Sequence, residues 1–332
     1  MAQRVWLISI LSLSLIFVFD RAQATHSLLF AGSALVDTAP FLLLSIAVAA
    51  WAEATGADNL ISKAFVGAPF SMISLAALTG AISPFCSCGV IPLIAALLAM
   101  GVPLSAVMAF WLASPIMDPS MFILTAGMVG FEFAIAKTIA AIALGGFGGI
   151  VVHLLRKRDT FSDPLRPGIG NGGCGSAKIR TPKPILWRFW IEKKRRDNFI
   201  SSALIITLFL AKWLFLAFIV ESLMLSWLPA ETITNAIGGD GFIPIVIATL
   251  VGVPAYLNGY AALPLVSGLL QQGMAPGAAM SFLIAGGVTS IPASIAVWAL
   301  ARPKVFILYI FLSLFGAFSC GFLFQQLHKF SY

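Results

Sequence analysis

Apolar stretches of roughly membrane-spanning length recur along most of the chain. They predict helical spans near residues 5–20, 30–52, 66–84, 103–127, 131–155, 198–226, 240–256, 277–300 and 303–326. Two further apolar segments, 89–100 and 260–272, are too short to cross a bilayer as straight helices. We expect these two to be broken or re-entrant helices, which membranes tolerate where protein or a water-filled cavity covers the exposed backbone.

Composition supports the same class. Of 332 residues, 60% are hydrophobic and 10% are charged, and the mean hydropathy is +0.99. A soluble domain carries about 25% charged residues, so a water-facing surface cannot be built from this chain. We therefore predict an all-α, polytopic transmembrane helical bundle. No phosphate-binding loop, Ser/His/Asp set or His-Glu-x-x-His motif occurs, so we expect neither an enzyme nor a resident cofactor.

The positive charge is concentrated in one place. Twelve of the twenty Lys and Arg residues lie between Arg156 and Arg196, in a loop between apolar runs. This distribution is typical of a cytoplasmic loop that follows the positive-inside rule, and not of a nucleic-acid partner. We expect a multi-pass protein of the cell inner (plasma) membrane, with this loop in the cytoplasm.

The chain divides around that loop. We expect a first transmembrane repeat at 27–155, a basic, Gly- and Pro-rich flexible linker at 156–197, a second repeat at 198–326 and a tail at 327–332. Residues 1–26 are either a first span or a signal peptide that ends at Ala22-Gln23-Ala24.

The two repeats align by eye. Residues 83–89 match 253–259 at an offset of 170, and after a two-residue slip 97–102 match 269–274, Phe110 matches Phe282, and Ser114-Pro115 matches Gly286-Gly287. Each half is thus predicted to contain the same interrupted helix. If the short segments cross the membrane, each half has five crossings and the halves are inverted, as in many secondary transporters. If the short segments are re-entrant, the count is four and the repeat is parallel. We favour the inverted arrangement.

Proline and glycine mark the interruptions. Proline lacks the amide hydrogen and glycine frees the backbone dihedrals, so backbone groups become available to line a solute site near the midplane. The alternative is that these residues only kink packed helices. The predicted helix-break residues are Pro84, Pro92, Pro115, Pro119, Pro254 and Pro264.

Cys86-Ser87-Cys88, followed by Gly89, lies beside the first break. Two thiols at this spacing could bind a soft species such as a trivalent metalloid, Cu(I) or Zn²⁺. They could also form a membrane-embedded redox or sensor pair, or serve close helix packing. The second half has no thiols at the matching positions, which excludes a symmetric four-thiolate site.

Several polar residues lie within the apolar spans. Asp118, after Ser114, could bind and release a proton as the coupling ion, and it could also cap a helix that restarts at Pro119. Asp37 has the same two alternatives. Lys137 can extend to the interface, whereas Lys212 lies deeper and could pair with either aspartate. Further candidate solute or ion contacts at the second break are Tyr256, Asn258, Gly259 and Tyr260.

Two motifs resemble the YraQ/ArsP-like predicted permease family. The first is Ser83-Pro84-Phe85-Cys86-Ser87-Cys88-Gly89-Val90-Ile91-Pro92-Leu93 with Ala113-Ser114-Pro115-Ile116-Met117-Asp118-Pro119, and the second is Asn258–Leu265 with Pro276–Leu283. The resemblance covers about residues 27–326. It implies a multi-span permease, since some members export trivalent organoarsenicals and others are linked to copper or zinc efflux. It also implies that the thiols of the arsenical exporters correspond to Cys86 and Cys88. Asp118 is a departure, because the family pattern has Asn there.

Together these observations predict a secondary transporter in the lipid bilayer. We expect it to export a soft metalloid, a metal or a thiol-reactive solute such as a trivalent arsenical, with protons as a coupling ion. The alternatives are the thiol redox or sensor protein and a permease subunit of a multi-chain complex.

Overall fold

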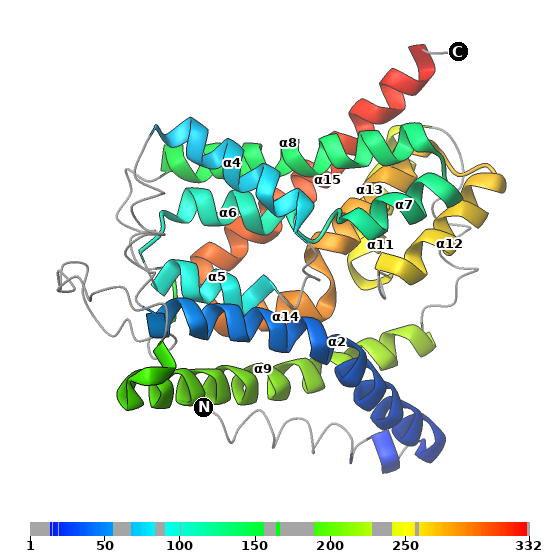
Figure 1. Ribbon diagram of the computed structural model, residues 1–332. Coiled ribbons are helices and arrows are strands. Elements are labelled where there is room, and N and C mark those ends of the chain that lie inside the picture. Colours follow the sequence, from blue (N-terminus) through cyan, green and yellow to red (C-terminus); the bar gives the residue numbers. More distant parts are fainter. Residues whose placement is uncertain are drawn as a thin grey trace.

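The computed structural model describes residues 14, 16–18, 20–55, 68–83, 90–99, 101–155, 164–166, 189–227, 241–255 and 259–330. Every regular element in these ranges is a helix, which confirms the predicted all-α class (Figure 1). The helices are α2 (Arg21–Thr55), α4 (Pro69–Ile82), α5 (Val90–Ala99), α6 (Leu104–Ala113), α7 (Pro119–Met128), α8 (Phe131–Leu155), η2 (Phe189–Ile191), α9 (Lys193–Trp227), α11 (Phe242–Ala255), α12 (Gly259–Gln271), α13 (Pro276–Thr289), α14 (Ile291–Leu300) and α15 (Pro303–Phe330).

Four stretches of the described chain are long and apolar enough to cross a membrane. They are Phe131–Leu155, Lys193–Val220, Pro276–Leu300 and Pro303–His328. Three of the spans predicted from the sequence are not single helices of membrane-spanning length. The predicted spans 66–84 and 240–256 each contain a helix of 14 residues, and 103–127 is divided into two helices of 10 residues. A helix of 10 to 14 residues is about 15–21 Å long, and the hydrocarbon core is about 30 Å thick.

The two longest helices, α2 and α9, pack against each other along one side of the bundle (Figure 1). They are antiparallel, because Arg195 in the first turn of α9 donates hydrogen bonds of 3.1 Å to the carbonyls of Ala54 and Thr55 at the end of α2. The C-terminal carbonyls of a helix have no partner within the helix. Arg195 therefore supplies this end of α2 with donors.

In the first half, α4 and α6 run in the same direction. A Cβ added at Gly149, near the end of α8, would lie 2.6 Å from Ile73 in α4 and 2.9 Å from the Ser105 carbonyl near the start of α6. At the other end of α4, a Cβ at Gly80 would lie 2.7 Å from the carbonyl of Phe110. The turn after α5 leads directly into α6, so α5 returns to the end of the bundle from which α4 starts. The α4–α5 pair is therefore a re-entrant hairpin.

The second half contains a similar hairpin that enters from the opposite end. Phe242 at the start of α11 packs edge-on against Phe318 in α15, with 5.2 Å between ring centroids. A Cβ at Gly277, at the start of α13, would lie 2.5 Å from the carbonyl of Gly321, again in the C-terminal half of α15. Helix α12 leads through a tight turn into α13, so the α11–α12 hairpin starts and ends there.

The same turn follows both hairpins. Gly101 (φ 87°) and Gly273 (φ 97°) adopt the left-handed conformation that glycine accommodates without strain. Each turn contains the hydrogen-bond pair of a Schellman motif, which ends a helix at a glycine. The bonds are Val102 N to Leu97 O (3.0 Å), Gly101 N to Leu98 O (3.1 Å), Met274 N to Leu269 O (2.9 Å) and Gly273 N to Leu270 O (3.1 Å).

These matching features share one offset in the numbering, which is 172 between the two Schellman glycines. The same offset relates the close contact of Gly80 with Phe110 to the contact of Gly252 with Phe282, whose carbonyl would lie 2.8 Å from an added Cβ. The offset of 170 predicted at the first motif differs from this value. At 172, Pro92 matches Pro264, and no slip is needed between Gly80 and Phe110.

Part of the predicted linker is docked on the bundle. Leu165 forms an antiparallel bridge with Ala301, between α14 and α15. Arg166 donates from its backbone amide to the Leu300 carbonyl (3.0 Å), and its side chain lies over the Trp298 ring at 4.8 Å. The flexible linker expected from the Gly- and Pro-rich composition is thus held at residues 164–166. This places it beside Arg302, at the end of the bundle that we call the basic end.

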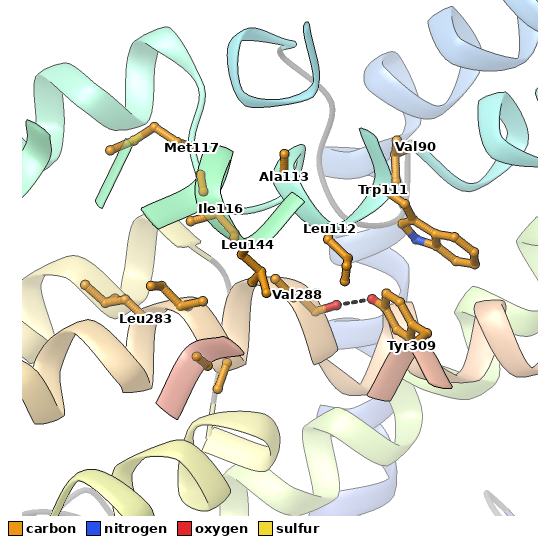
Figure 2. Close-up of a cluster of buried hydrophobic side chains, with 14 of the residues drawn as sticks. Val90, Trp111, Leu112, Ala113, Ile116, Met117, Leu144, Leu283, Val288 and Tyr309 are labelled. Atoms are coloured by element: carbon orange, nitrogen blue, oxygen red, sulfur yellow. Dashed lines mark hydrogen bonds between the residues drawn. The ribbon is translucent and has the colours of Figure 1, made fainter. Parts of the chain in front are cut away.

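The core lies where the two halves meet. Trp111 of α6 stacks on Tyr309 of α15, with ring centroids 4.9 Å apart, and both side chains are about 1% exposed (Figure 2). Leu112 and Leu144 surround the same region (Figure 2). The last residues of α6 and α13, Ala113 and Thr289, are 0% exposed, so these two helix ends are packed within protein.

Candidate functional site

The segment between α6 and α7 interrupts the first half at the centre of the bundle. Residues 114–116 form a turn after α6, and α7 begins at Pro119. The side chain of Asp118 caps α7 by accepting a hydrogen bond of 2.8 Å from the backbone amide of Met121, and Ser120 also donates to it. An aspartate at this position satisfies free amides and opposes the positive end of the helix dipole. Helix capping by Asp118 is therefore a structural fact, whereas a proton-carrying role stays a prediction.

Ser114 connects this break to the end of α4. Its side chain is 2% exposed, and its hydroxyl lies 2.9 Å from the hydroxyl of Ser83, the residue that follows α4. Ser83 and the buried Val90 are the described residues on either side of 84–89. This hydrogen bond, between two serines that are distant in the sequence, brings the start of the first sequence motif to the α6–α7 break.

Seven of the predicted site residues lie outside the described residues. They are Pro84, Cys86, Ser87, Cys88, Gly89, Tyr256 and Asn258. The predicted thiol ligation therefore stays a prediction.

The described prolines lie in different local settings. Pro92 is the third residue of α5, where the missing amide costs no hydrogen bond within the helix. Pro254 lies in the last turn of α11, which ends at Ala255, and Pro264 lies inside α12, which begins at Gly259. Pro115 is in the turn after α6. The expectation that the interruptions extend to Pro92 and Pro264 is wrong, because helices continue through both.

The second half is interrupted at Ser290. Helix α13 passes through Gly286 and Gly287 and ends at Thr289, and α14 follows at Ile291. The match of Ser114-Pro115 to Gly286-Gly287 therefore does not give the position of this break. Ser290 instead matches Asp118, at the same offset of 172 as the other paired features.

Tyr309 supplies a donor at this second break. Its hydroxyl donates to the carbonyl of Val288, in the last turn of α13 (Figure 2). That carbonyl is among those that lack a partner within the helix. At the second break, the free carbonyl is thus paired with a side chain of the protein itself. This tyrosine was not identified from the sequence.

Lys137 occupies the place in the first half that matches Tyr309, again at an offset of 172. Its side chain is 0% exposed, which contradicts the expectation that it extends to the interface. Its ammonium has no hydrogen-bond partner among the described residues. Asp118 is the charged group that acts on it electrostatically. The signal in the sequence was a lysine early in a long apolar span, but hydropathy does not show which way a helix faces.

Lys212 does not pair with an aspartate. It is 9% exposed, and its ammonium lies over the Phe209 ring, 4.9 Å from the centroid, in a cation–π contact. Neither Asp37 nor Asp118 forms a salt bridge with it in the described structure, where an ion pair is formed by Arg195 and Glu192. The suggested pairing of Lys212 is therefore wrong. No group of three or more His, Cys, Asp or Glu side chains comes together within the described ranges.

These features define a class: a helical membrane protein with several apolar spans, interrupted helices and re-entrant half-spans around a polar centre. Residues 23–326 match the sequence profile of a family described as predicted permease (ArsP_1). The chain belongs to this family, and so it is a multi-pass membrane transporter. The resemblance noted from the motifs is confirmed.

Two relatives of this chain carry only descriptive names. The UPF0718 protein YcgR of Bacillus subtilis is 28% identical over 138 residues, which cover 41% of this chain and 47% of YcgR, so that match spans about half of the relative. The UPF0718 protein MJ0584 of Methanocaldococcus jannaschii is 19% identical over 325 residues, covering 82% of this chain and 89% of the relative. No solved structure matches this chain.

Proposed function

We propose that this permease is a secondary transporter that exports a soft metalloid, a soft metal ion or a thiol-reactive solute, and that the solute passes the α6–α7 break. The observation that carries this proposal is the interruption at Ser114–Asp118, close to the first motif through the Ser83–Ser114 hydrogen bond. Interrupted helices at the centre of a membrane protein expose backbone and capping groups there, and transporters use such groups to bind solutes and ions.

The two halves are inverted repeats in this proposal. Both helices of each hairpin return to the end from which they start, so each half crosses the membrane three times and not five or four, and an odd number inverts the second half. Helices α2 and α9 begin at matching positions, Arg21 and Lys193, and are antiparallel, and α8 and α15 also run in opposite directions. The α4–α5 and α11–α12 hairpins enter from opposite ends. A two-fold relation of this kind lets the same chain adopt inward- and outward-facing forms by exchanging the conformations of its halves.

The basic end faces the cytoplasm of a cell bounded by an inner (plasma) membrane. The support is the docking of Pro164–Arg166 on Arg302, together with the contact of Arg195 with the end of α2. These contacts gather basic residues from three parts of the chain at one end of the bundle, as the positive-inside rule requires of a cytoplasmic face.

Cys86 and Cys88 bind the solute in this proposal, and Asp118 exchanges the coupling proton. Thiolates select soft ions, and a carboxylate inside a membrane protein is suited to a proton relay. Ser87, Gly89, Ser114, Tyr256, Asn258 and Gly259 complete the solute contacts. Lipid is the surrounding solvent.

A resistance assay tests the thiol ligands. In cells that lack other exporters, we expect expression of the wild-type chain to raise tolerance to phenylarsine oxide and to lower its accumulation. Cys86→Ser and Cys88→Ser should each abolish that protection because two thiolates are needed to hold a soft centre. Cys320→Ser, a half-buried thiol in α15, is the matched control and should protect as well as wild type. Full protection by both motif variants would rule out thiol ligation.

A further inference from the structure

The ammonium of Lys137 is fully buried and has no hydrogen-bond acceptor in the described part of the chain. No other lysine among the described residues is in this state. An ionisable side chain inside a membrane domain is costly to keep, and such residues usually face a partner or a functional cavity. Removing the partner of a buried charge is strongly destabilising, because the charge that remains is uncompensated. The question is therefore what compensates Lys137.

Few groups are available to do so. The helices packed against α8 are α4, α6, α7, α13 and α15, and α4, α6 and α13 contain no charged residue. The other charged or titratable groups on α8 itself and on α15 are Glu132, His153, Lys304, Tyr309, Cys320, His328 and Lys329. The carboxylate among them, Glu132, is exposed in the first turn of α8. Asp118, the N-cap of α7, is left as the carboxylate that acts on Lys137.

Asp118, the N-cap of α7, and Lys137, in α8, belong to helices that pack against each other, and they form no salt bridge. Asp118 acts on Lys137 electrostatically, but no nitrogen–oxygen pair between them comes within the 4.0 Å of a salt bridge. The Asp118 oxygen Oδ1 already accepts from Met121 and Ser120. The ammonium therefore has N–H donors without an acceptor among the described residues, and the carboxylate already accepts two hydrogen bonds.

The matching position in the second half makes the difference clear. Tyr309, which matches Lys137 in the repeat, is neutral and donates to the Val288 carbonyl at its own break. Lys137 places a positive charge at the corresponding level and has no such bond. The break after α13 thus has a neutral hydroxyl hydrogen-bonded to its free carbonyl, whereas the break between α6 and α7 has two opposite charges, Asp118 and Lys137, that form no salt bridge.

We propose that Lys137 is the counter-charge of Asp118, so that the α6–α7 break is an electroneutral site that binds a net-neutral solute able both to donate and to accept hydrogen bonds. Such a solute accepts hydrogen bonds from the Lys137 ammonium and donates one from a hydroxyl to the Asp118 carboxylate, and so it connects the two charged groups. A bare metal cation is repelled by Lys137, and a free anion is repelled by Asp118, because charges interact strongly in a low-dielectric interior. This inference rests on the proposed passage of solute through the break, and it narrows the solutes named there to uncharged ones.

The charge pair is tested without any solute. We would measure the thermal unfolding of the purified full-length protein for Asp118→Asn in two backgrounds, wild type and Lys137→Met. Asn keeps the helix cap, so the substitution removes mainly the charge. We expect Asp118→Asn to lower Tm by roughly 4–10 °C in wild type and by much less in Lys137→Met. Lys137→Arg should restore the larger effect because it restores the charge.

The control is a cycle of Lys212→Met with Asp37→Asn, a buried lysine and an acidic residue that form no ion pair, and their effects should add. If Lys137→Met does not fold, Lys137→Gln takes its place. Equal loss from Asp118→Asn in both backgrounds would overturn the proposal.

The charge selectivity is tested with two probes. Inverted membrane vesicles would be offered neutral phenylarsine oxide and Zn²⁺, and accumulation of each measured. We expect wild type to accumulate phenylarsine oxide and to exclude Zn²⁺, and Lys137→Gln to shift the ratio toward Zn²⁺ by at least about tenfold, because a like charge has been removed. Wild-type accumulation of Zn²⁺ over phenylarsine oxide, or an unchanged ratio in the variant, contradicts the electroneutral site. Transport of neither probe by wild type contradicts the proposed function, and the unfolding cycle still decides the Lys137–Asp118 pair.

Discussion

Gly145 and Gly146 in α8 are adjacent, yet their surroundings predict opposite responses to alanine. A Cβ at Gly145 would lie 2.6 Å from the Ala109 carbonyl oxygen and 2.9 Å from the Cβ of Ala113, both in α6. A Cβ at Gly146 would meet nothing within 4 Å. The carbonyl is backbone, so Gly145→Ala cannot be accommodated by a rotamer change, and α8 must move away from α6.

The size of the effect follows from two opposing terms. Replacing glycine by alanine inside a helix stabilises it by about 1 kcal/mol. Overpacking a close interface costs about 1–3 kcal/mol, and a shift of roughly half an ångström also weakens the dispersion contacts along α6. We therefore expect Gly145→Ala to lose about 1–2 kcal/mol and Gly146→Ala to gain up to about 1 kcal/mol.

The assay is thermal unfolding of the two purified variants in the same detergent, followed by the loss of the monodisperse peak in size-exclusion chromatography. At about 2–4 °C per kcal/mol, Gly146→Ala should unfold roughly 2–12 °C above Gly145→Ala. If both variants unfold at the same temperature, the close approach of α8 and α6 is wrong.

Two further predictions concern hydrogen bonds that close helix ends. Tyr309→Phe keeps the ring that stacks on Trp111 but leaves the buried Val288 carbonyl without its donor, so we expect a loss of about 1–3 kcal/mol, seen as a lower Tm; no change would mean that the hydroxyl is not needed. Arg195→Gln removes both donors to the end of α2, and faster amide hydrogen exchange in its last turn is expected, whereas Lys194→Gln, which is exposed, should leave that exchange as it is.

The apolar pattern was sufficient for the helical class and for the spans that run straight. The predicted span 131–155 coincides with α8, and 303–326 lies within α15. The Asp118-Pro119 pair predicted the start of α7 because both residue types favour the first turn of a helix. These features depend on local chemistry, which the sequence states directly.

Long-range geometry could not be obtained in this way. The apolar run at 66–84 has the length of a span, yet its helix has only 14 residues and ends at Ile82, and α5 runs back toward the start of α4. Hydropathy could not predict this return, because it counts apolar residues and does not record the direction of the chain. The burial of Lys137 likewise depends on which face of α8 meets the other helices. The sequence comparison gave an offset of 172 only after the two-residue slip, and contacts such as those of Gly80 and Gly252 extend that offset to positions before the first motif.

The two ends of the bundle are joined unequally, and this bears on how the halves can separate. At the basic end, four hydrogen bonds connect 164–166 with 300–302, and the side chain of Arg166 also lies over Trp298. Residues 155 and 164 are nine apart, so that part of the connection reaches at most about 30–32 Å. At the other end, Ser267 of α12 donates a bond of 2.9 Å to the Met128 carbonyl at the end of α7, and Ser222 of α9 donates one of 3.0 Å to Ser27 of α2. Any movement of the halves that separates residues 164–166 from 300–302 would therefore have to break these four hydrogen bonds together.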